Sequence, residues 1–203
     1  MLKRVCVYCG SGVGGREEYA QAARALGRAF VERGIGLVFG GGRIGMMGTL
    51  AETVLAGGGE AIGVIPRHLE EKGLALTSVT SLRVVEGMHA RKALMADLAD
   101  AFIAMPGGFG TAEEFFEALT WAQLALHLKP CGLLNVKGYF DPLIRFVDHA
   151  VQEGFIHPAH RDLMLVDGSP EALLGRLASY KPPPAADKVI WALRENGRSE
   201  PEA

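Results

Sequence analysis

The sequence lacks any apolar run long enough to span a membrane, and it lacks an excess of one charge. Its 203 residues carry 21 Lys and Arg against 23 Asp and Glu, for a formal net charge of −2 at pH 7. A spanning helix needs roughly 20 consecutive apolar residues, and nucleic-acid-binding domains are usually strongly basic. We therefore expect a cytoplasmic protein that binds neither membrane nor nucleic acid, so that any phosphate it binds belongs to a small molecule.

Cysteine is scarce, which excludes a disulfide framework. Only Cys6, Cys9 and Cys131 are present, and the first two fall in the first predicted strand, where their odd spacing points them to opposite faces. A redox Cys-x-x-Cys pair opens a helix instead. We expect all three thiols to be reduced and largely buried, and leave open whether Cys9, at the strand end, lines a site.

What the sequence does contain is an alternation of apolar runs and helical patterns, within a composition that is 49% hydrophobic and 22% charged. Strands are predicted at 4–9, 36–39, 61–65, 82–85, 101–105 and 132–135, with 163–166 as a further candidate. Helices are predicted at 17–33, 45–56, 89–98, 112–126, 142–153 and 170–179. Such alternation is typical of successive βα units. It predicts the α/β class, with a doubly wound, mostly parallel, Rossmann-like sheet that has helices on both faces.

The length of the chain favours one domain, which we assign to residues 1–180. Three consecutive prolines, 182–184, then form a stiff extended segment. Residues 181–203 are expected to be a Pro-rich linker and tail, in which a short helical turn carries Trp191.

The stretch AFIAMPGGFGTAEEFFEAL, residues 101–119, reads as a strand, a glycine turn and the start of a helix. Such a turn leaves backbone N–H groups unpaired next to the positive end of the helix dipole, so it can bind phosphate. Glu113 and Glu114 follow directly. Acidic residues in a first helical turn ordinarily complement the dipole, but a carboxylate beside an anion site can also be there for chemistry. Both interpretations stay open on this stretch alone.

Two other glycine-rich loops follow predicted strands. Gly10, Gly12 and Gly15 fit a G-x-G-x-x-G spacing, which alone is weak evidence for a dinucleotide site. An NAD-binding domain also places an acidic residue near the end of the second strand, whereas residues 39–43 read FGGGR. The loop at 40–48 would let backbone approach a ligand closely, or its glycines only meet the steric needs of a tight turn.

A basic pair opens the helix predicted before the PGGFGT motif. Arg91 and Lys92 lie near the N-terminus of that helix, where cations oppose the dipole. They are therefore expected to face an anionic ligand or Glu114. His89 is expected to be a surface or capping residue. The segment His157-Pro158-Ala159-His160 lacks the further ligands of a zinc site, so no metal is expected.

Taken together, GGGRIGMMG, MHARK, PGGFGTAEE and TWAQLALHLKPCGLLNVKGYFDPL resemble the LONELY GUY family of cytokinin riboside 5′-monophosphate phosphoribohydrolases, whose members often carry the label lysine decarboxylase-like. The resemblance runs from about Val5 to about Ser179. It implies hydrolysis of the N-glycosidic bond of a nucleoside 5′-monophosphate to free base and ribose 5-phosphate, without metal or organic cofactor. It also implies a homodimer with the site near the interface.

The resemblance implies catalytic roles for Arg91 and Glu114. The positions that match the family's substrate-binding residues are Gly10, Ser11, Gly41, Gly42, Gly45, Met88, Lys92, Pro106, Gly107, Gly108, Gly110, Thr111, Glu113 and Thr120. Plant members carry a glutamate where this chain has Gly73, with Glu70 and Glu71 nearby. The preferred base, an N6-modified adenine or the adenine of AMP, therefore stays open.

The chemistry of the residues agrees with this resemblance. Cleavage of an N-glycosidic bond passes through an oxocarbenium-like sugar, which a carboxylate such as Glu114 can stabilise, or it can activate water. Arg91 can orient Glu114 and keep it ionised, or bind sugar or phosphate.

Two other functions and one structural question remain at this point. The chain could be a nucleotide-binding or regulatory module without turnover. A pyridoxal-phosphate-dependent decarboxylase is disfavoured because the chain is short for those folds and no lysine has a Schiff-base context. Phe115, Phe116 and Trp121 lie in a dimer interface or in the core, and periodicity does not choose between these.

Overall fold

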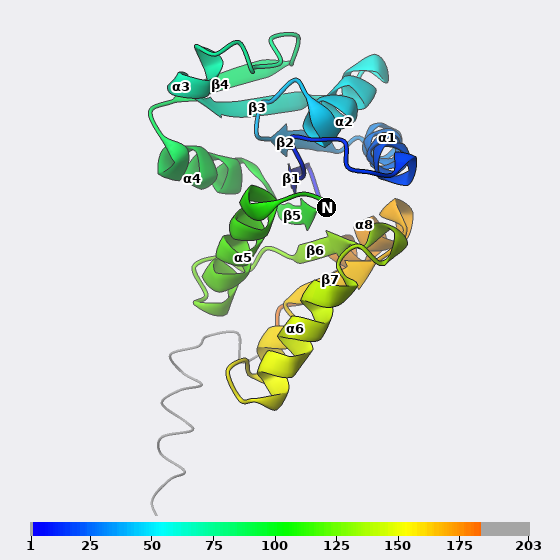
Figure 1. Ribbon diagram of the computed structural model, residues 1–203, viewed down its shortest axis with the longest axis vertical. Coiled ribbons are helices and arrows are strands. Elements are labelled where there is room, and N and C mark those ends of the chain that lie inside the picture. The colour runs from blue at the N-terminus through cyan, green and yellow to red at the C-terminus, as the bar shows by residue number, and fades with distance from the viewer. Residues whose placement is uncertain (1, 184–203) are drawn as a thin grey trace, which may run out of the picture.

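The computed structural model of this protein describes residues 2–183 and shows one α/β domain (Figure 1). Its sheet has seven strands in the order β4-β3-β2-β1-β5-β6-β7, and every strand pair is parallel. The strands are β1 (Arg4–Tyr8), β2 (Gly36–Phe39), β3 (Ala61–Pro66), β4 (Ser81–Val85), β5 (Ala101–Ala104), β6 (Cys131–Leu134) and β7 (Met164–Asp167). The helices are α1 (Glu17–Arg33), α2 (Gly45–Ala56), α3 (Arg67–Glu70), α4 (Met88–Leu98), α5 (Phe109–Gln123), η1 (Val136–Gly138), α6 (Asp141–Gln152), α7 (Pro158–Arg161) and α8 (Pro170–Ser179).

The predicted fold class is confirmed, and no predicted strand end differs from the structure by more than one residue. The sequence did not predict α3, η1 and α7, which are too short to show a helical period. The linker from residue 184 onward and the turn around Trp191 lie outside the described residues. Within residues 2–183, no helix is both long and apolar enough to cross a bilayer.

Helix α5 differs most from its prediction, because it begins at Phe109 rather than at residue 112. Gly108 is its N-cap, with extended backbone and no side-chain cap. Gly110 and Thr111 therefore belong to the first helical turn rather than to the preceding loop. Glu113 and Glu114 are the fifth and sixth residues of the helix, and its first turn has no acidic residue. The interpretation of these glutamates as dipole-complementing acids is therefore wrong.

Helices cover both faces of the sheet (Figure 1), and an apolar layer lies between the sheet and the helices on each face. One is formed with α1, α2 and α8, the other with α4, α5 and α6. Along β1 the side chains alternate: Val5 and Val7 face the first layer, Cys6 and Tyr8 the second. Because both faces are buried, these strands are almost continuously apolar, which is why they could be predicted.

The three cysteines lie in these two apolar layers, and Phe115, Phe116 and Trp121 of α5 lie in or against one of them. The three thiols are free and buried, as expected, and Cys9 lies one residue beyond β1, on the face opposite Cys6. Phe115 is a core residue at 1% exposure, whereas Phe116 and Trp121 are partly buried against the same layer. The core interpretation therefore holds for Phe115.

The order of the strands fixes where a ligand can bind. The chain builds outward from β1 to β4 on one side and from β5 to β7 on the other. In such sheets the ligand site lies beyond the carboxyl ends of the strands, where the order reverses. Here the loops after β1 and β5 are in contact, since Gly10 N–H donates to the Pro106 carbonyl at 3.1 Å.

Candidate active site

A cavity of about 470 Å³ lies at this edge of the sheet. The loops after β1 and β2, the start of α4 and the start of α5 form its walls. Its polar side is made by the glycine loops and by Arg91, Thr111, Glu113 and Glu114. The volume lies within the usual range for small-molecule sites, about 300–1,000 Å³.

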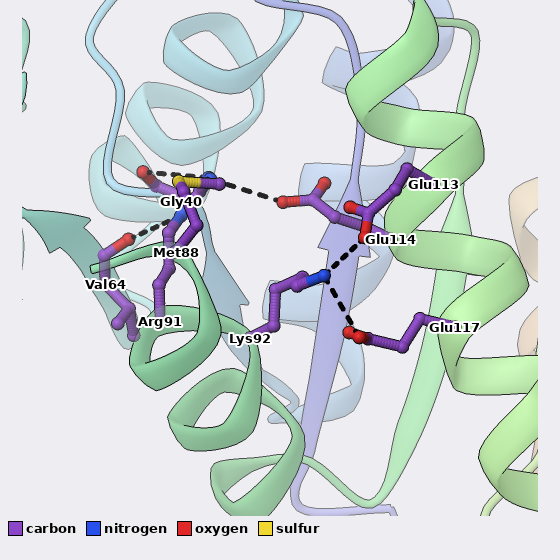
Figure 2. Close-up of polar contacts among 8 residues, drawn as sticks. All are labelled: Gly40, Val64, Met88, Arg91, Lys92, Glu113, Glu114 and Glu117. Carbon is purple, nitrogen blue, oxygen red and sulfur yellow. Dashed lines mark hydrogen bonds and ion pairs between the residues drawn. The ribbon is translucent and has the colours of Figure 1, made fainter.

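A buried ion pair faces this cavity. Arg91 Nη1 lies 3.3 Å from Glu114 Oε1, and each side chain is only 10% exposed. The guanidinium also donates from Nε to the Val64 carbonyl at 3.1 Å and from Nη2 to the Gly40 carbonyl at 3.3 Å (Figure 2). A Cβ on Gly40 would lie 1.9 Å from Arg91 Nη2, so only glycine leaves room for this contact. Backbone from two strand ends thus fixes the cation against the carboxylate.

The environment of Glu114 suits acid–base chemistry. Burial raises the pKa of its carboxyl group, and the attraction of Arg91 opposes this without cancelling it. A carboxylate with a raised pKa in a cavity is a common feature of catalytic sites. Glu114 therefore lines the cavity with a carboxyl group whose pKa is raised.

Lys92, next to Arg91 in sequence, points elsewhere. Its Nζ binds Glu113 and also Glu117, the latter at 3.0 Å, so it joins α4 to α5 (Figure 2). Burial would lower the pKa of the ammonium group, but the two carboxylates outweigh burial and raise it. Lys92 is 8% exposed and is not part of the cavity wall.

The N-terminus of α5 has the features of an anion site. Among the bonds found within residues 2–183, none is donated by the N–H groups of Gly108, Phe109, Gly110 or Thr111. Unpaired N–H groups at a helix start, together with the helix dipole, favour phosphate. The first turn of α5 and Glu114 in the next turn border the same cavity.

The glycine loops after β1 and β2 are shaped by close backbone contacts. Gly45 has φ +66°, and a Cβ there would lie 2.2 Å from the Ser11 carbonyl oxygen. Met46 N–H donates to the Gly10 carbonyl at 3.0 Å, which ties the start of α2 to the loop after β1. Gly41, at φ +72°, likewise needs the left-handed conformation that glycine allows.

Most of the predicted site residues come together. Those that line the cavity are Gly10, Ser11, Gly42, Met88, Arg91, Gly108, Gly110, Thr111, Glu113 and Glu114. Gly41 and Gly45 shape its loops, and Pro106 and Gly107 border an adjoining cavity. Thr120 is not brought to the site: its hydroxyl donates to the Phe116 carbonyl, and it borders a separate cavity of about 180 Å³. His89 is exposed, as expected.

The apolar wall of the cavity was not predicted. It consists of Ile44, Met47, Ile65, Leu69 and Leu74. Cys9, for which the sequence left a place in a site open, also lines the cavity. Two of these residues, Leu69 and Leu74, come from the segment around α3, whose sequence has no periodic signal. Glu70 and Glu71 do not line the cavity. Gly73 contributes its carbonyl to Arg43 at 2.8 Å instead. In residues 2–183, no three His, Cys, Asp or Glu side chains gather as metal ligands.

Comparison with known proteins identifies the family. A sequence model described as "Possible lysine decarboxylase" matches residues 47–177. Over 200 residues the chain is 46% identical to cytokinin riboside 5′-monophosphate phosphoribohydrolase LOG1 of Arabidopsis thaliana, covering 98% of this chain and 94% of that protein. Over 181 residues it is 50% identical to cytokinin riboside 5′-monophosphate phosphoribohydrolase LOG of Oryza sativa subsp. japonica, covering 89% and 75%.

Among solved structures, the molybdenum cofactor carrier protein of Chlamydomonas reinhardtii matches with a TM-score of 0.66. It covers 89% of this chain and all of that one at 22% identity, so the likeness concerns the fold alone. The curated relatives, by contrast, match at high identity over nearly the whole chain. On this evidence the protein belongs to the LONELY GUY family of cytokinin riboside 5′-monophosphate phosphoribohydrolases.

Proposed function

We propose that this protein hydrolyses the N-glycosidic bond of cytokinin-type purine nucleoside 5′-monophosphates, releasing the free base and ribose 5-phosphate. The observation that carries the proposal is the Arg91–Glu114 pair, which faces the same cavity as the unpaired N–H groups that begin α5. One end of this cavity suits a phosphate, and a carboxylate lies within reach of the sugar that the phosphate carries.

The reaction follows from this arrangement. The bond from C1′ of the ribose to N9 of the base breaks, and its electron pair leaves with the base, which then takes a proton. The positive charge that develops on the sugar is stabilised by the Glu114 carboxylate. Water adds to C1′ and gives a proton to Glu114, whose raised pKa suits it to accept one. Binding energy from the remote phosphate holds the sugar in place.

Arg91 acts on this carboxylate from a fixed position. Its bonds to the Val64 and Gly40 carbonyls hold the guanidinium before any ligand arrives. It favours the ionised form of Glu114, which burial disfavours. The carboxylate is therefore available both to stabilise the cationic sugar and to accept the proton of water.

The apolar wall supports a base with an apolar substituent. Ile44, Met47, Leu69 and Leu74 line the cavity without a charged side chain among them. Ile44 is 49% exposed, so burying it against a ligand would remove apolar surface from water. This favours an N6-modified adenine over the adenine of AMP.

Decarboxylation of lysine, which the family's label suggests, does not suit the site. A Schiff-base lysine needs a lowered pKa so that the free amine is available. The pKa of Lys92 is raised, and two carboxylates hold its ammonium group. The other lysines of residues 2–183 do not line the cavity.

Product analysis tests the proposal. Incubation with AMP and with isopentenyladenosine monophosphate, followed by chromatography, should yield free base and ribose 5-phosphate, faster with the modified nucleotide. Glu114→Ala and Arg91→Ala should abolish the products. Recovery of intact nucleotide, with tight binding by calorimetry, would instead support a nucleotide-binding module without turnover.

We propose also that the protein is a cytoplasmic homodimer, with residues 1–180 as its domain. Phe109 is 98% exposed beside the cavity, and Leu126 and Leu128 are 69% and 58% exposed after α5. Burying such side chains against a second copy would be favourable. Light scattering coupled to size exclusion measures the mass of the assembly. A truncation after residue 180 that keeps its thermal stability would support the domain boundary.

A further inference from the structure

A tyrosine that the family resemblance did not single out contacts the loop after β5 from outside the active-site cavity. Tyr139 Oη donates a hydrogen bond to the Gly107 carbonyl at 2.5 Å. This contact borders a second cavity of about 390 Å³, which shares Gly10, Ser11 and Gly108 with the first. The loop after β5 is thus a wall between two cavities, and Tyr139 lies on the side away from Glu114.

The turn that presents Tyr139 has an unusual backbone. Lys137 and Gly138, directly before it, have φ of +52° and +72°. A left-handed conformation at a residue other than glycine costs free energy and persists only where the surroundings impose it. Here the side chains of Asn135 and Asp141 are hydrogen bonded at 2.7 Å, which closes the turn.

Tyr139 is 39% exposed, and its ring contacts two other aromatic rings. It packs edge to face against Tyr19, with ring centroids 5.6 Å apart, and against Phe140 at 5.0 Å. Aromatic contacts of this kind are favourable and directional. The strained turn and the two rings together direct the hydroxyl group at one carbonyl.

The bond to Gly107 determines the direction of the next N–H group. The Gly107 carbonyl and the Gly108 N–H belong to one planar trans peptide, so they point in opposite directions. With the carbonyl turned to Tyr139, the N–H of Gly108 is turned away from it, and Gly108 also lines the active-site cavity. A hydrogen bond to the carbonyl further polarises the peptide and strengthens its N–H as a donor.

We propose that Tyr139 is a positioning residue for the substrate's phosphate: its hydroxyl group fixes the Gly107–Gly108 peptide so that the Gly108 N–H donates to that phosphate. The proposal rests on the function proposed above. On this proposal the second cavity belongs to the same site, because Tyr139 lines it and binds the loop after β5 from there.

The test is Tyr139→Phe, which removes the hydroxyl group and keeps the ring contacts. Tyr19→Phe is the matched control, since Tyr19 lines the same cavity and its hydroxyl group makes no bond within residues 2–183. The measurements are kcat and KM for AMP, with inhibition constants for ribose 5-phosphate and for isopentenyladenosine, a nucleoside without phosphate. Thermal unfolding of each variant accompanies them.

In Tyr139→Phe, KM for AMP and the inhibition constant of ribose 5-phosphate should rise by about threefold to tenfold, the usual effect of one lost hydrogen bond. The constant for isopentenyladenosine and kcat should change little, and Tyr19→Phe should behave as wild type. Unchanged phosphate affinity overturns the proposal, and so does an equal loss for the nucleoside, which would indicate a general disturbance of the site. If wild-type protein hydrolyses neither AMP nor isopentenyladenosine monophosphate, the proposed function fails, and calorimetry with ribose 5-phosphate still compares wild type with Tyr139→Phe.

Discussion

Replacing Glu114 by Gln should remove activity and leave the fold intact. At 3.3 Å, opposite charges attract by about 5 kcal/mol when the effective dielectric constant is about 20. Burying a carboxylate costs several kcal/mol, and the raised pKa of Glu114 shows that this cost is the larger effect. A neutral glutamine removes both contributions but leaves the buried guanidinium of Arg91 without a counter-ion, so we expect the free energy of unfolding at pH 7 to fall by about 1–3 kcal/mol. Arg91 keeps its bonds to two backbone carbonyls.

The rate of hydrolysis, in contrast to stability, should fall strongly in Glu114→Gln. Loss of an acid–base group typically lowers kcat/KM by about 10²–10⁴, measured here by chromatography of the released base. Urea unfolding followed by circular dichroism gives the stability. Glu52→Gln is the matched control, because Glu52 is an exposed residue of helix α2. Activity within tenfold of wild type would refute the catalytic role. A loss of stability above about 3 kcal/mol would show that the pair, and not burial, dominates.

The stability difference between wild type and Glu114→Gln should also change with pH in a definite direction. Because the pKa of Glu114 is raised in the folded protein, the native state binds this proton more tightly than the unfolded chain. The stability of wild type relative to Glu114→Gln should therefore fall as pH rises from the ordinary value of 4.5 through the raised folded pKa, and be constant above it. A difference that grows with pH would mean that the folded pKa is lowered instead.

Three further predictions concern the surroundings of the site. In Lys92→Met, the acid limb of the rate–pH profile should move to higher pH, because the charge of Lys92 lowers the pKa of Glu114; an unmoved limb would contradict this. Gly45→Ala should lower the melting temperature by at least about 4 °C, since Gly45 has φ +66° and a Cβ there meets a backbone oxygen at 2.2 Å. Gly12→Ala, where a Cβ meets nothing within 4 Å, is its control in the same scan. Leu74→Ala should raise KM for isopentenyladenosine monophosphate by about tenfold relative to AMP, since the apolar wall is then shortened; equal changes for both nucleotides would place the substituent elsewhere.

The inner strands of the sheet could be predicted because burial on both faces makes each of them an apolar run, whereas the edge strand β4 is only partly buried. Helix ends were predictable where a specific residue forms them: Gly34 ends α1 in the left-handed conformation at φ +64°, and Ser169 caps α8 before a proline. The start of α5 was missed because no capping side chain marks it and its first turn contains a glycine. The N–H groups of a first helical turn have no intrahelical partner. Gly110 can therefore lie in this turn, although a glycine at this position suggests a loop.

The partners of Arg91 and Lys92 could be predicted only in part from the sequence. The sequence predicted that Arg91 faces an anionic ligand or Glu114, and the structure places it against Glu114. It predicted the same for Lys92, which binds Glu113 and Glu117 instead. Adjacent helical residues point about 100° apart, so Arg91 and Lys92 need not both face the cavity. Which of the two does so depends on how α4 is rotated against the sheet, and no local pattern records this.

The contrast between Lys92 and the Arg91–Glu114 pair supports the catalytic role proposed for Glu114. Lys92 bridges its two carboxylates, and burial does not prevent its pKa from rising. Glu114 has one cation, held by backbone carbonyls, and its pKa is raised, so the pair does not offset the cost of burial. A purely structural pair would be expected to gain from its partners as Lys92 does. A carboxylate that remains unfavourable without a ligand gains most when a positive charge develops beside it. An oxocarbenium-like sugar supplies that charge only in the transition state, which is the condition for an interaction to speed a reaction rather than tighten binding.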